Sequence, residues 1–162
     1  MARHRVTEKL WFDDLSGCQK SEKEIGTIAV VHACKEPCHR HAVGYQDRSL
    51  DSSHPHYLCL EKPHHLYLNM IDPPAPLFKA ESFAAFFQFV DREIALRPVL
   101  IHCNKGESRA PSLTLLYMAK RLGLLPNESY QAAAAAFSAR FPYKPGKGIA
   151  AYLEKNWNAL GV

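Results

Sequence analysis

The order of apolar patterns over residues 65–102 constrains the fold of this chain more than any other feature. Residues 65–70 alternate between polar and apolar side chains as a strand does, and three prolines within residues 72–76 then end the regular structure. Apolar side chains recur at helical spacing over residues 81–97, and residues 98–102 form a short, mostly apolar run typical of a buried strand. A strand, a helix and a second strand in this order predict a parallel crossover.

The remaining segments extend this pattern on both sides. Residues 9–12 and the β-branched run 25–33 are typical of strands, whereas the Pro- and His-rich residues 34–63 predict mostly loop or a short edge strand. Residues 109–122 are apolar on most faces, and Gly123 follows them, which predicts a helix buried beneath the sheet.

Two further helices are predicted near the end of the chain, one from a cap at Asn127 through the alanines 132–136 and one over residues 147–157. We therefore expect a three-layer α/β fold, in which helices flank a central, twisted, mostly parallel sheet of four to five strands. With 162 residues, of which 47% are hydrophobic, we expect a single domain over residues 1–162.

The composition of the chain indicates where the protein is located and what kind of partner it binds. The sequence has no apolar run of membrane-spanning length and no apolar segment near its start that resembles a secretory signal, so we expect a cytoplasmic protein. Five cysteines are an odd number without a secretory context, which favours reduced thiols. The net charge of +4 fits an anionic partner, but the basic residues are scattered, so nucleic acid is not indicated.

The segment from residue 99 to residue 112 carries the chemistry. It consists of a hydrophobic strand, a seven-residue loop from Cys103 to Arg109 and the start of a helix. Backbone N–H groups at such a helix N-terminus, together with the helix dipole, bind an anion. Gly106 lets the loop curl, Pro111 fits the first helical turn, and Arg109 can offer a bidentate fork to two phosphate oxygens.

The same positive field acts on Cys103, so the sequence predicts a thiolate nucleophile at this position. His102 precedes it, and we expect this side chain to orient the loop by hydrogen bonding rather than to act as a base. A cysteine followed six positions later by an arginine also occurs at Cys34 and Arg40, but that segment lacks a glycine and a following helical pattern. We interpret the earlier pair as coincidence.

The run His102-Cys-Asn-Lys-Gly-Glu-Ser-Arg109 resembles the signature of the cysteine-dependent protein tyrosine phosphatase superfamily, and the Gly-Glu-Ser-Arg-Ala-Pro portion looks most like small dual-specificity phosphatases. The resemblance implies that Cys103 attacks phosphorus and that the loop and Arg109 hold the phosphate oxygens. It implies no cofactor. The phosphate-binding residues would be Asn104, Lys105, Gly106, Glu107, Ser108 and Arg109.

In that superfamily an aspartic acid on a separate loop protonates the leaving oxygen, and Asp72 looks like the match. Physical reasoning selects it too, because Asp72 and Cys103 both follow the carboxyl ends of predicted parallel strands, which share one rim in open α/β sheets. Asp13 or Glu81 could take this role if the strand prediction is wrong.

The residue directly after Arg109 differs from the signature of the superfamily, and this difference affects turnover. The superfamily usually has Ser or Thr directly after the arginine, where the hydroxyl helps the cysteine sulfur to leave, but this chain has Ala110. We therefore expect slow hydrolysis of the phosphocysteine and low turnover.

The function expected from these residues is a protein phosphatase that hydrolyses phosphotyrosine, with phosphoserine and phosphothreonine as further candidates, through a phosphocysteine intermediate. Three alternatives stay open: a phosphate-binding module or weakly active pseudophosphatase, a phosphatase for phosphoinositides or RNA 5′-phosphates, and, ranked last, a rhodanese-like sulfur or arsenate enzyme. We expect a monomer that acts on a phosphorylated protein, holds phosphate or sulfate in the loop, and binds neither nucleic acid nor membrane.

A second cluster of reactive side chains lies in the 34–63 segment. Cys34, Cys38, His39 and His41, with further histidines and Cys59 beyond, could be interpreted as a zinc site. The spacing is irregular for such sites, so we interpret these residues as ordinary loop residues and expect no metal.

Overall fold

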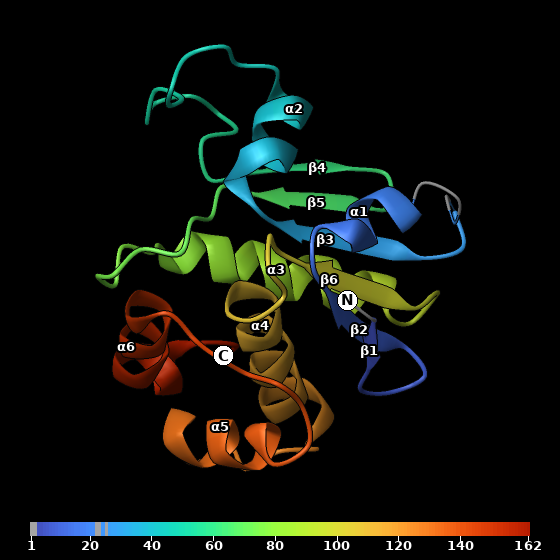
Figure 1. Ribbon diagram of the computed structural model, residues 1–162, viewed down its shortest axis with the longest axis vertical. Helices are drawn as coiled ribbons and strands as arrows, with labels where there is room; N and C mark the ends of the chain where they lie inside the picture. The colour runs from blue at the N-terminus through green and yellow to red at the C-terminus, as the bar shows by residue number, and fades with distance from the viewer. Residues whose placement is uncertain (1–2, 22–23, 25) are drawn as a thin grey trace.

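A six-stranded sheet forms the centre of the protein (Figure 1). The computed structural model describes residues 3–21, 24 and 26–162. The strands lie in the order β1-β2-β6-β3-β5-β4. Their bounds are β1 His4–Arg5, β2 Leu10–Asp13, β3 Ala29–Ala33, β4 Cys59–Lys62, β5 His65–Leu68 and β6 Val99–His102.

The sheet confirms the predicted fold class and corrects the strand count. The four central strands run parallel, whereas β1 and β4 pair antiparallel at the two edges. The sixth strand is β1, which has only two residues and therefore offers no alternating pattern from which a strand could be predicted.

The predicted helices are all present, with shifted ends. The long helices are α3 Ala80–Glu93, α4 Arg109–Tyr117, α5 Tyr130–Ser138 and α6 Lys147–Asn156, and the turn η3 Met118–Leu122 extends α4 as far as Gly123. The predicted cap at Asn127 is wrong, because Ser129 takes an extended backbone and its hydroxyl accepts a hydrogen bond from the Ala132 N–H at 3.1 Å. Helix α3 ends at Glu93 rather than near residue 97, since Pro98 has no N–H to donate to the Ile94 carbonyl oxygen and its ring would crowd that carbonyl in a continued helix.

Short helical elements occupy places that the sequence pattern left as loop. They are α1 Ser16–Ser21, η2 Lys35–His39 and α2 Arg40–Val43, whereas η4 Trp157–Ala159 continues the last predicted helix beyond its expected end. Elements of four to six residues are too short to show a 3.6-residue period, which explains why the sequence did not predict them. No helix among the described residues is long and apolar enough to span a membrane.

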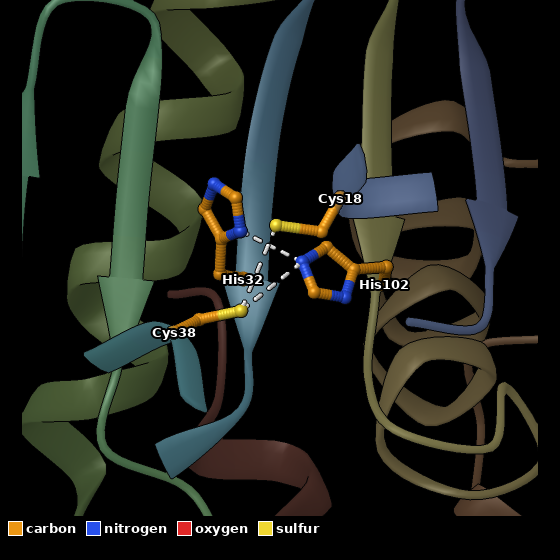
Figure 2. Close-up of side chains that lie close together, drawn as sticks. All are labelled: Cys18, His32, Cys38 and His102. Atoms are coloured by element: carbon orange, nitrogen blue, oxygen red, sulfur yellow. Dashed lines mark hydrogen bonds between the residues drawn. The ribbon is translucent and has the colours of Figure 1, made fainter. Parts of the chain in front are cut away.

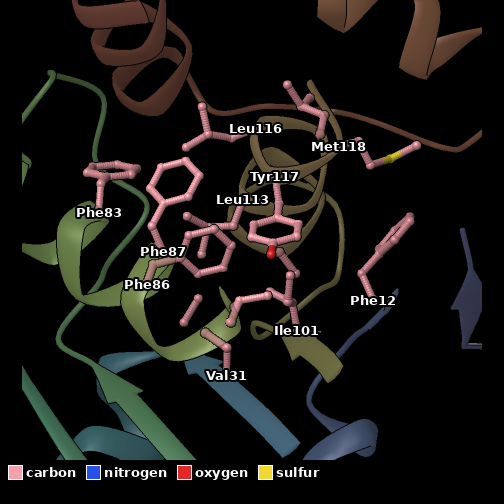
Figure 3. Close-up of a cluster of buried hydrophobic side chains, with 14 of the residues drawn as sticks. Phe12, Val31, Phe83, Phe86, Phe87, Ile101, Leu113, Leu116, Tyr117 and Met118 are labelled. Atoms are coloured by element: carbon pink, nitrogen blue, oxygen red, sulfur yellow. The ribbon is translucent and has the colours of Figure 1, made fainter. Parts of the chain in front are cut away.

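The main core lies between one face of the sheet and the helices α3 to α6. Alternate strand residues such as Phe12, Val31 and Ile101 point to this face and meet the aromatic side chains of α3 and the apolar side chains of α4 (Figure 3). Helix α4 is buried along its whole length, as predicted. The packing fixes the position of the α4 N-terminus against the carboxyl end of β6.

The opposite face of the sheet carries a much smaller apolar cluster, formed by Trp11, Ile28, Val30 and Leu100. Because side chains alternate along a strand, the residues two positions beyond Val30 and Leu100 point to this face as well. These residues are His32 on β3 and His102 on β6, and the two are direct partners in the β3–β6 register.

Candidate active site

The loop between β6 and α4 is anchored on the segment that follows β2. The Cys103 N–H donates to the Asp13 carbonyl oxygen at 3.4 Å, and the Leu15 N–H donates to the Asn104 carbonyl oxygen at 3.1 Å. Gly106 has a φ of +72°, and a Cβ there would lie 3.0 Å from the Asp14 backbone nitrogen. Glycine is therefore required at this position both for its backbone conformation and for its close approach to Asp14.

Arg109 starts α4 and turns its guanidinium back across the loop. Its Nη1 donates to the Met70 carbonyl oxygen and its Nη2 donates to the Asn104 side-chain oxygen, both at 2.8 Å. The remaining donor, Nε, is buried and has no hydrogen-bond partner among the described residues. A buried guanidinium N–H without an acceptor costs free energy unless an anion reaches it.

These groups border a pocket of about 400 Å³. Its lining residues are Asp72, Cys103, Asn104, Lys105, Glu107, Ser108, Arg109, Lys144 and Gly146. The Cys103 side chain is nearly buried at the base of the loop, with a relative exposure of 2%. The lining has three cationic side chains against the two acids Asp72 and Glu107, and the α4 N-terminus adds to the positive field, which suits an anion.

Asp72 lies against the loop, as the strand-end argument predicted. Its Oδ1 accepts a hydrogen bond from the Ser108 hydroxyl at 3.0 Å, and the Ser108 Oγ accepts one from the Gly146 N–H at 2.8 Å. A Cβ on Gly146 would lie 2.4 Å from the Asp72 Oδ1. The Asp72 carboxylate can occupy this position only because residue 146 has no side chain.

Residues 144–146 also contribute to the pocket, which was not predicted from the sequence. The Lys144 N–H donates to the Glu107 carbonyl oxygen at 2.8 Å, which fastens this segment to the loop. The only available signal was the Pro145-Gly146 pair before a predicted helix, which marks a turn and does not reveal which surface the turn contacts.

The two other acids considered for the Asp72 role lie elsewhere. Asp13 is buried at the end of β2, where its Oδ1 accepts from the Asp14 N–H at 2.7 Å, and it does not line the pocket. Glu81 is on the exposed side of α3. Among the three, only Asp72 lines the pocket, because Asp13 contacts the loop through its backbone carbonyl oxygen and its carboxylate lies outside the pocket.

His102 has the contact expected of a residue that orients the loop. Its Nδ1 lies 3.3 Å from the Cys103 carbonyl oxygen, which can only accept, so Nδ1 carries the proton. The other nitrogen of the same ring faces away from the pocket towards His32 at 2.7 Å.

Neither of the two nearby serine hydroxyls, Ser108 and Ser112, takes the place of the side chain that Ala110 lacks. The Ser108 hydroxyl donates to Asp72, and the Ser112 hydroxyl pairs with the Tyr143 hydroxyl at 2.6 Å. Ala110 itself is fully buried in the first turn of α4.

The earlier cysteine and arginine pair does not form an anion loop. The Arg40 Nε donates to both Glu36 carboxylate oxygens, at 2.7 and 2.9 Å, and its Nη1 donates to the Asp47 carbonyl oxygen. Cys34 is buried beside the pocket loop, and its thiol donates to the Glu36 carbonyl oxygen at 2.7 Å, with the Asn104 side-chain oxygen farther away at 3.5 Å. A hydrogen bond from Cys38 lowers the pKa of the Cys34 thiol to about 6 against the opposing effect of burial.

Comparison with known proteins identifies the fold. The sequence matches no protein-family model and no curated protein. The structure, however, has the fold of the dual-specificity and tyrosine phosphatases over nearly its full length.

Three solved structures illustrate the similarity. Human tyrosine phosphatase-like serine/threonine/tyrosine-interacting protein is 18% identical, with 97% of this chain and 95% of that chain covered and a TM-score of 0.62. The Cydia pomonella PTP-2 phosphatase is 16% identical, with 95% and 89% covered and a TM-score of 0.63. Human DUSP28 is 20% identical, with 97% and 93% covered and a TM-score of 0.59. At these identities the similarity establishes the fold, and the chemistry must be argued from the site.

Proposed function

We propose that this protein is a phosphatase that hydrolyses phosphotyrosine in proteins, with phosphoserine and phosphothreonine as further substrates, through a phosphocysteine intermediate. The observation that carries the proposal is the arrangement of Cys103 and Arg109 around one pocket. A nearly buried thiol lies at the base of an anion-binding loop, and the Nε of a buried guanidinium beside it lacks an acceptor among the described residues. A phosphoryl oxygen would supply that acceptor.

In the first step of the proposed reaction, the Cys103 thiolate attacks phosphorus in line with the leaving oxygen. The S–P bond forms, the P–O bond to the substrate breaks, and Asp72 donates its proton to the leaving oxygen. Asp72 is suited to this role because the Ser108 hydroxyl, which accepts a hydrogen bond from the Gly146 N–H, donates to its carboxylate at the rim of the pocket.

In the second step, water attacks phosphorus and transfers a proton to the Asp72 carboxylate. The S–P bond breaks, inorganic phosphate leaves, and the Cys103 thiolate is restored. Throughout both steps Arg109 and the loop N–H groups stabilise the charge on the phosphoryl oxygens, which is the main way in which proteins accelerate phosphoryl transfer.

Hydrolysis of p-nitrophenyl phosphate at mildly acidic pH tests the proposal. The wild-type protein should turn over the substrate, whereas Cys103→Ser should reduce the rate to background because the hydroxyl is a far weaker nucleophile. Cys59→Ser is the matched control, since Cys59 lies on β4 and does not line the pocket. Activity retained by Cys103→Ser would show that the nucleophile is wrongly assigned.

Ala110 supports a second candidate function, the capture of phosphorylated proteins with little or no turnover. The residue at this position cannot supply a hydroxyl to the departing sulfur, and the nearby serine hydroxyls are bonded elsewhere. Ala110→Ser separates the two functions. If the protein is a slow phosphatase, this change should raise the rate of phosphocysteine hydrolysis by about tenfold, which corresponds to ~1.4 kcal/mol.

Rapid-quench measurement of the phosphoenzyme in wild-type and Ala110→Ser protein provides the readout. Less phosphoenzyme and faster turnover in the variant support the phosphatase. Tight phosphopeptide binding by both proteins, without any phosphoenzyme, would favour the binding function.

A further inference from the structure

Four side chains with nitrogen or sulfur ligand atoms converge on the face of the sheet opposite the main core (Figure 2). We call them the Cys2His2 cluster; its members are Cys18, His32, Cys38 and His102. They come from four separate elements, α1, β3, η2 and β6. One ligand atom from each residue lies within 4.8 Å of those of the other three.

The strand register explains half of the cluster. His32 and His102 are direct partners on the neighbouring parallel strands β3 and β6, so their side chains leave the sheet side by side. The other two members are cysteines from the short helical elements that follow β2 and β3 on this face, α1 and η2. The cluster therefore joins the carboxyl-end segments of three strands.

The separation of the two sulfur atoms equals the value expected for tetrahedral zinc. A Zn–S bond of about 2.3 Å in a tetrahedron places two sulfur atoms roughly 3.8 Å apart, and the Cys18 and Cys38 sulfurs lie 3.8 Å apart. The Cys38 Sγ is 3.8 Å from the His102 Nε2, and that nitrogen is 2.7 Å from the His32 Nδ1. Two nitrogens bound to one tetrahedral zinc lie roughly 3.3 Å apart, so the two imidazole rings would move apart when an ion binds between the four atoms.

The surroundings orient the two imidazole rings for metal binding. The Nδ1 proton of His102 is held by the Cys103 carbonyl oxygen, so the lone pair of Nε2 faces the cluster. Such a hydrogen bond from the second ring nitrogen to a backbone carbonyl is typical of metal-bound histidines. His32 has a comparable partner, because its Nε2 lies 3.1 Å from the His65 Nδ1.

Burial and charge favour the same ligand set. His32, Cys38 and His102 are each no more than 5% exposed, whereas Cys18 is partly exposed and leaves a route for an ion from solvent. Two thiolates and two neutral imidazoles balance the charge of a divalent cation, so the filled site buries no net charge.

We propose that the Cys2His2 cluster is a structural zinc site. Closed tetrahedral sites with two thiolates and two imidazoles select zinc among the common divalent metals. Binding forms two Zn–S and two Zn–N bonds and releases the thiol protons of Cys18 and Cys38 to solvent. On His32 the proton is carried by Nε2 once Nδ1 binds the ion, and His65 accepts it as a hydrogen bond. This proposal departs from the expectation of no metal, and of the sequence's candidate ligands only Cys38 belongs to the cluster.

A zinc ion here would act on the loop without touching substrate. His102 is the residue directly before Cys103. A bound zinc ion would link His102 to His32 on β3 and to the cysteines of α1 and η2, which follow β2 and β3. None of the four ligands lines the pocket that holds Cys103 and Arg109. The ion is thus a positioning element for the first residue of the loop.

Metal content of the purified chain tests this inference without reference to phosphatase activity. After loading with zinc and dialysis against metal-free buffer, we expect one zinc per wild-type chain by plasma mass spectrometry. Cys18→Ser and Cys38→Ser should each lose most of it, whereas the matched control Cys59→Ser should retain it. Wild-type protein without bound zinc would overturn the proposal.

Two additional measurements locate the ion and define its ligands. Cys103→Ser should bind zinc as the wild type does, and loss of zinc in that variant would place the ion in the phosphate pocket instead. Cobalt titration of the wild-type chain needs no variant and should produce the visible bands of a tetrahedral site with two thiolate ligands. An octahedral cobalt spectrum without thiolate bands would also contradict the proposal.

Discussion

The position of the Asp72 carboxylate depends on the absence of a side chain at Gly146. Gly146 lies so close to Asp72 that any side chain at this position would displace the carboxylate. The other backbone contacts of the segment, including the Gly146 N–H bond to Ser108, do not involve the missing Cβ. A substitution of Gly146 therefore moves the Asp72 carboxylate without changing the carboxyl group itself.

We predict that Gly146→Ala lowers kcat for p-nitrophenyl phosphate by a factor on the order of 10², with KM changed little, because the general acid is displaced while the phosphate loop stays intact. Stability should change little, since the displaced group is the end of a flexible side chain. Asp72→Asn should lower kcat by a similar factor.

The double variant provides the control for this mechanism. If Gly146→Ala acts through Asp72, the two losses should not add when both substitutions are combined. Additive losses in steady-state kinetics would show that residue 146 affects the pocket independently of the acid.

At the scale of elements, the structure shows which of two candidate residues caps the N-terminus of α5. Asn127 and Ser129 are both good capping residues by type, but only the Ser129 hydroxyl accepts a hydrogen bond from the first turn, at the Ala132 N–H. Ser129→Ala should therefore lower the free energy of unfolding by about 1 kcal/mol. Asn127→Ala is the matched control and should stay within about 0.5 kcal/mol of the wild type. Urea unfolding of both variants measures the difference, and a larger loss from Asn127→Ala would contradict the assignment.

The elements with long periodic patterns were predictable, and the short ones were not. The spacing of Phe83, Phe86 and Phe87 predicted α3, and the strand, loop and helix around Cys103 were predicted as the structure has them. The candidate site was predictable to the same extent, because Asp72 follows β5 and Cys103 follows β6 at one rim of the sheet.

Contacts between residues far apart in the sequence, which depend on strand register or on how the helices pack, could not be predicted from the sequence. No local pattern indicates that His32 and His102, 70 positions apart, are partners across two strands. Likewise, nothing near Gly146 indicates that it contacts Asp72. These contacts follow from strand order and helix packing, which the whole chain determines.

At the scale of the whole molecule, a chain of hydroxyl groups links the helices beneath the sheet. The Tyr143 hydroxyl bonds to the Ser112 hydroxyl of α4 at 2.6 Å and to the Tyr130 hydroxyl of α5 at 2.8 Å. Burial raises the pKa of Tyr143 above its usual value, and burial also raises the pKa of Tyr130. The folded protein therefore keeps both phenols protonated at a pH where the unfolded chain ionises them.

It follows that the free energy of unfolding should decrease as pH rises above about 10, because the unfolded state then binds fewer protons than the folded state. Below that pH the contribution of these tyrosines is fully present. Tyr143→Phe should make the decrease shallower, since one ionisable group is removed. Urea unfolding at several pH values between neutrality and the alkaline range measures both slopes, and equal slopes would show that Tyr143 does not contribute.

The two edge strands of the sheet, β1 and β4, affect how readily two molecules can associate by pairing their strands. Strand β1 is only two residues long, and strand β4 ends in the exposed charged residues Glu61 and Lys62. A strand from a second molecule would find almost no backbone to pair with at β1 and would have to lie against charged side chains at β4. Both edges are therefore poor templates for the intermolecular strand pairing that starts aggregation. The parallel strands that hold the two histidines and the phosphate loop are shielded within the sheet, so we expect the protein to remain dispersed at concentrations where exposed flat edges would associate.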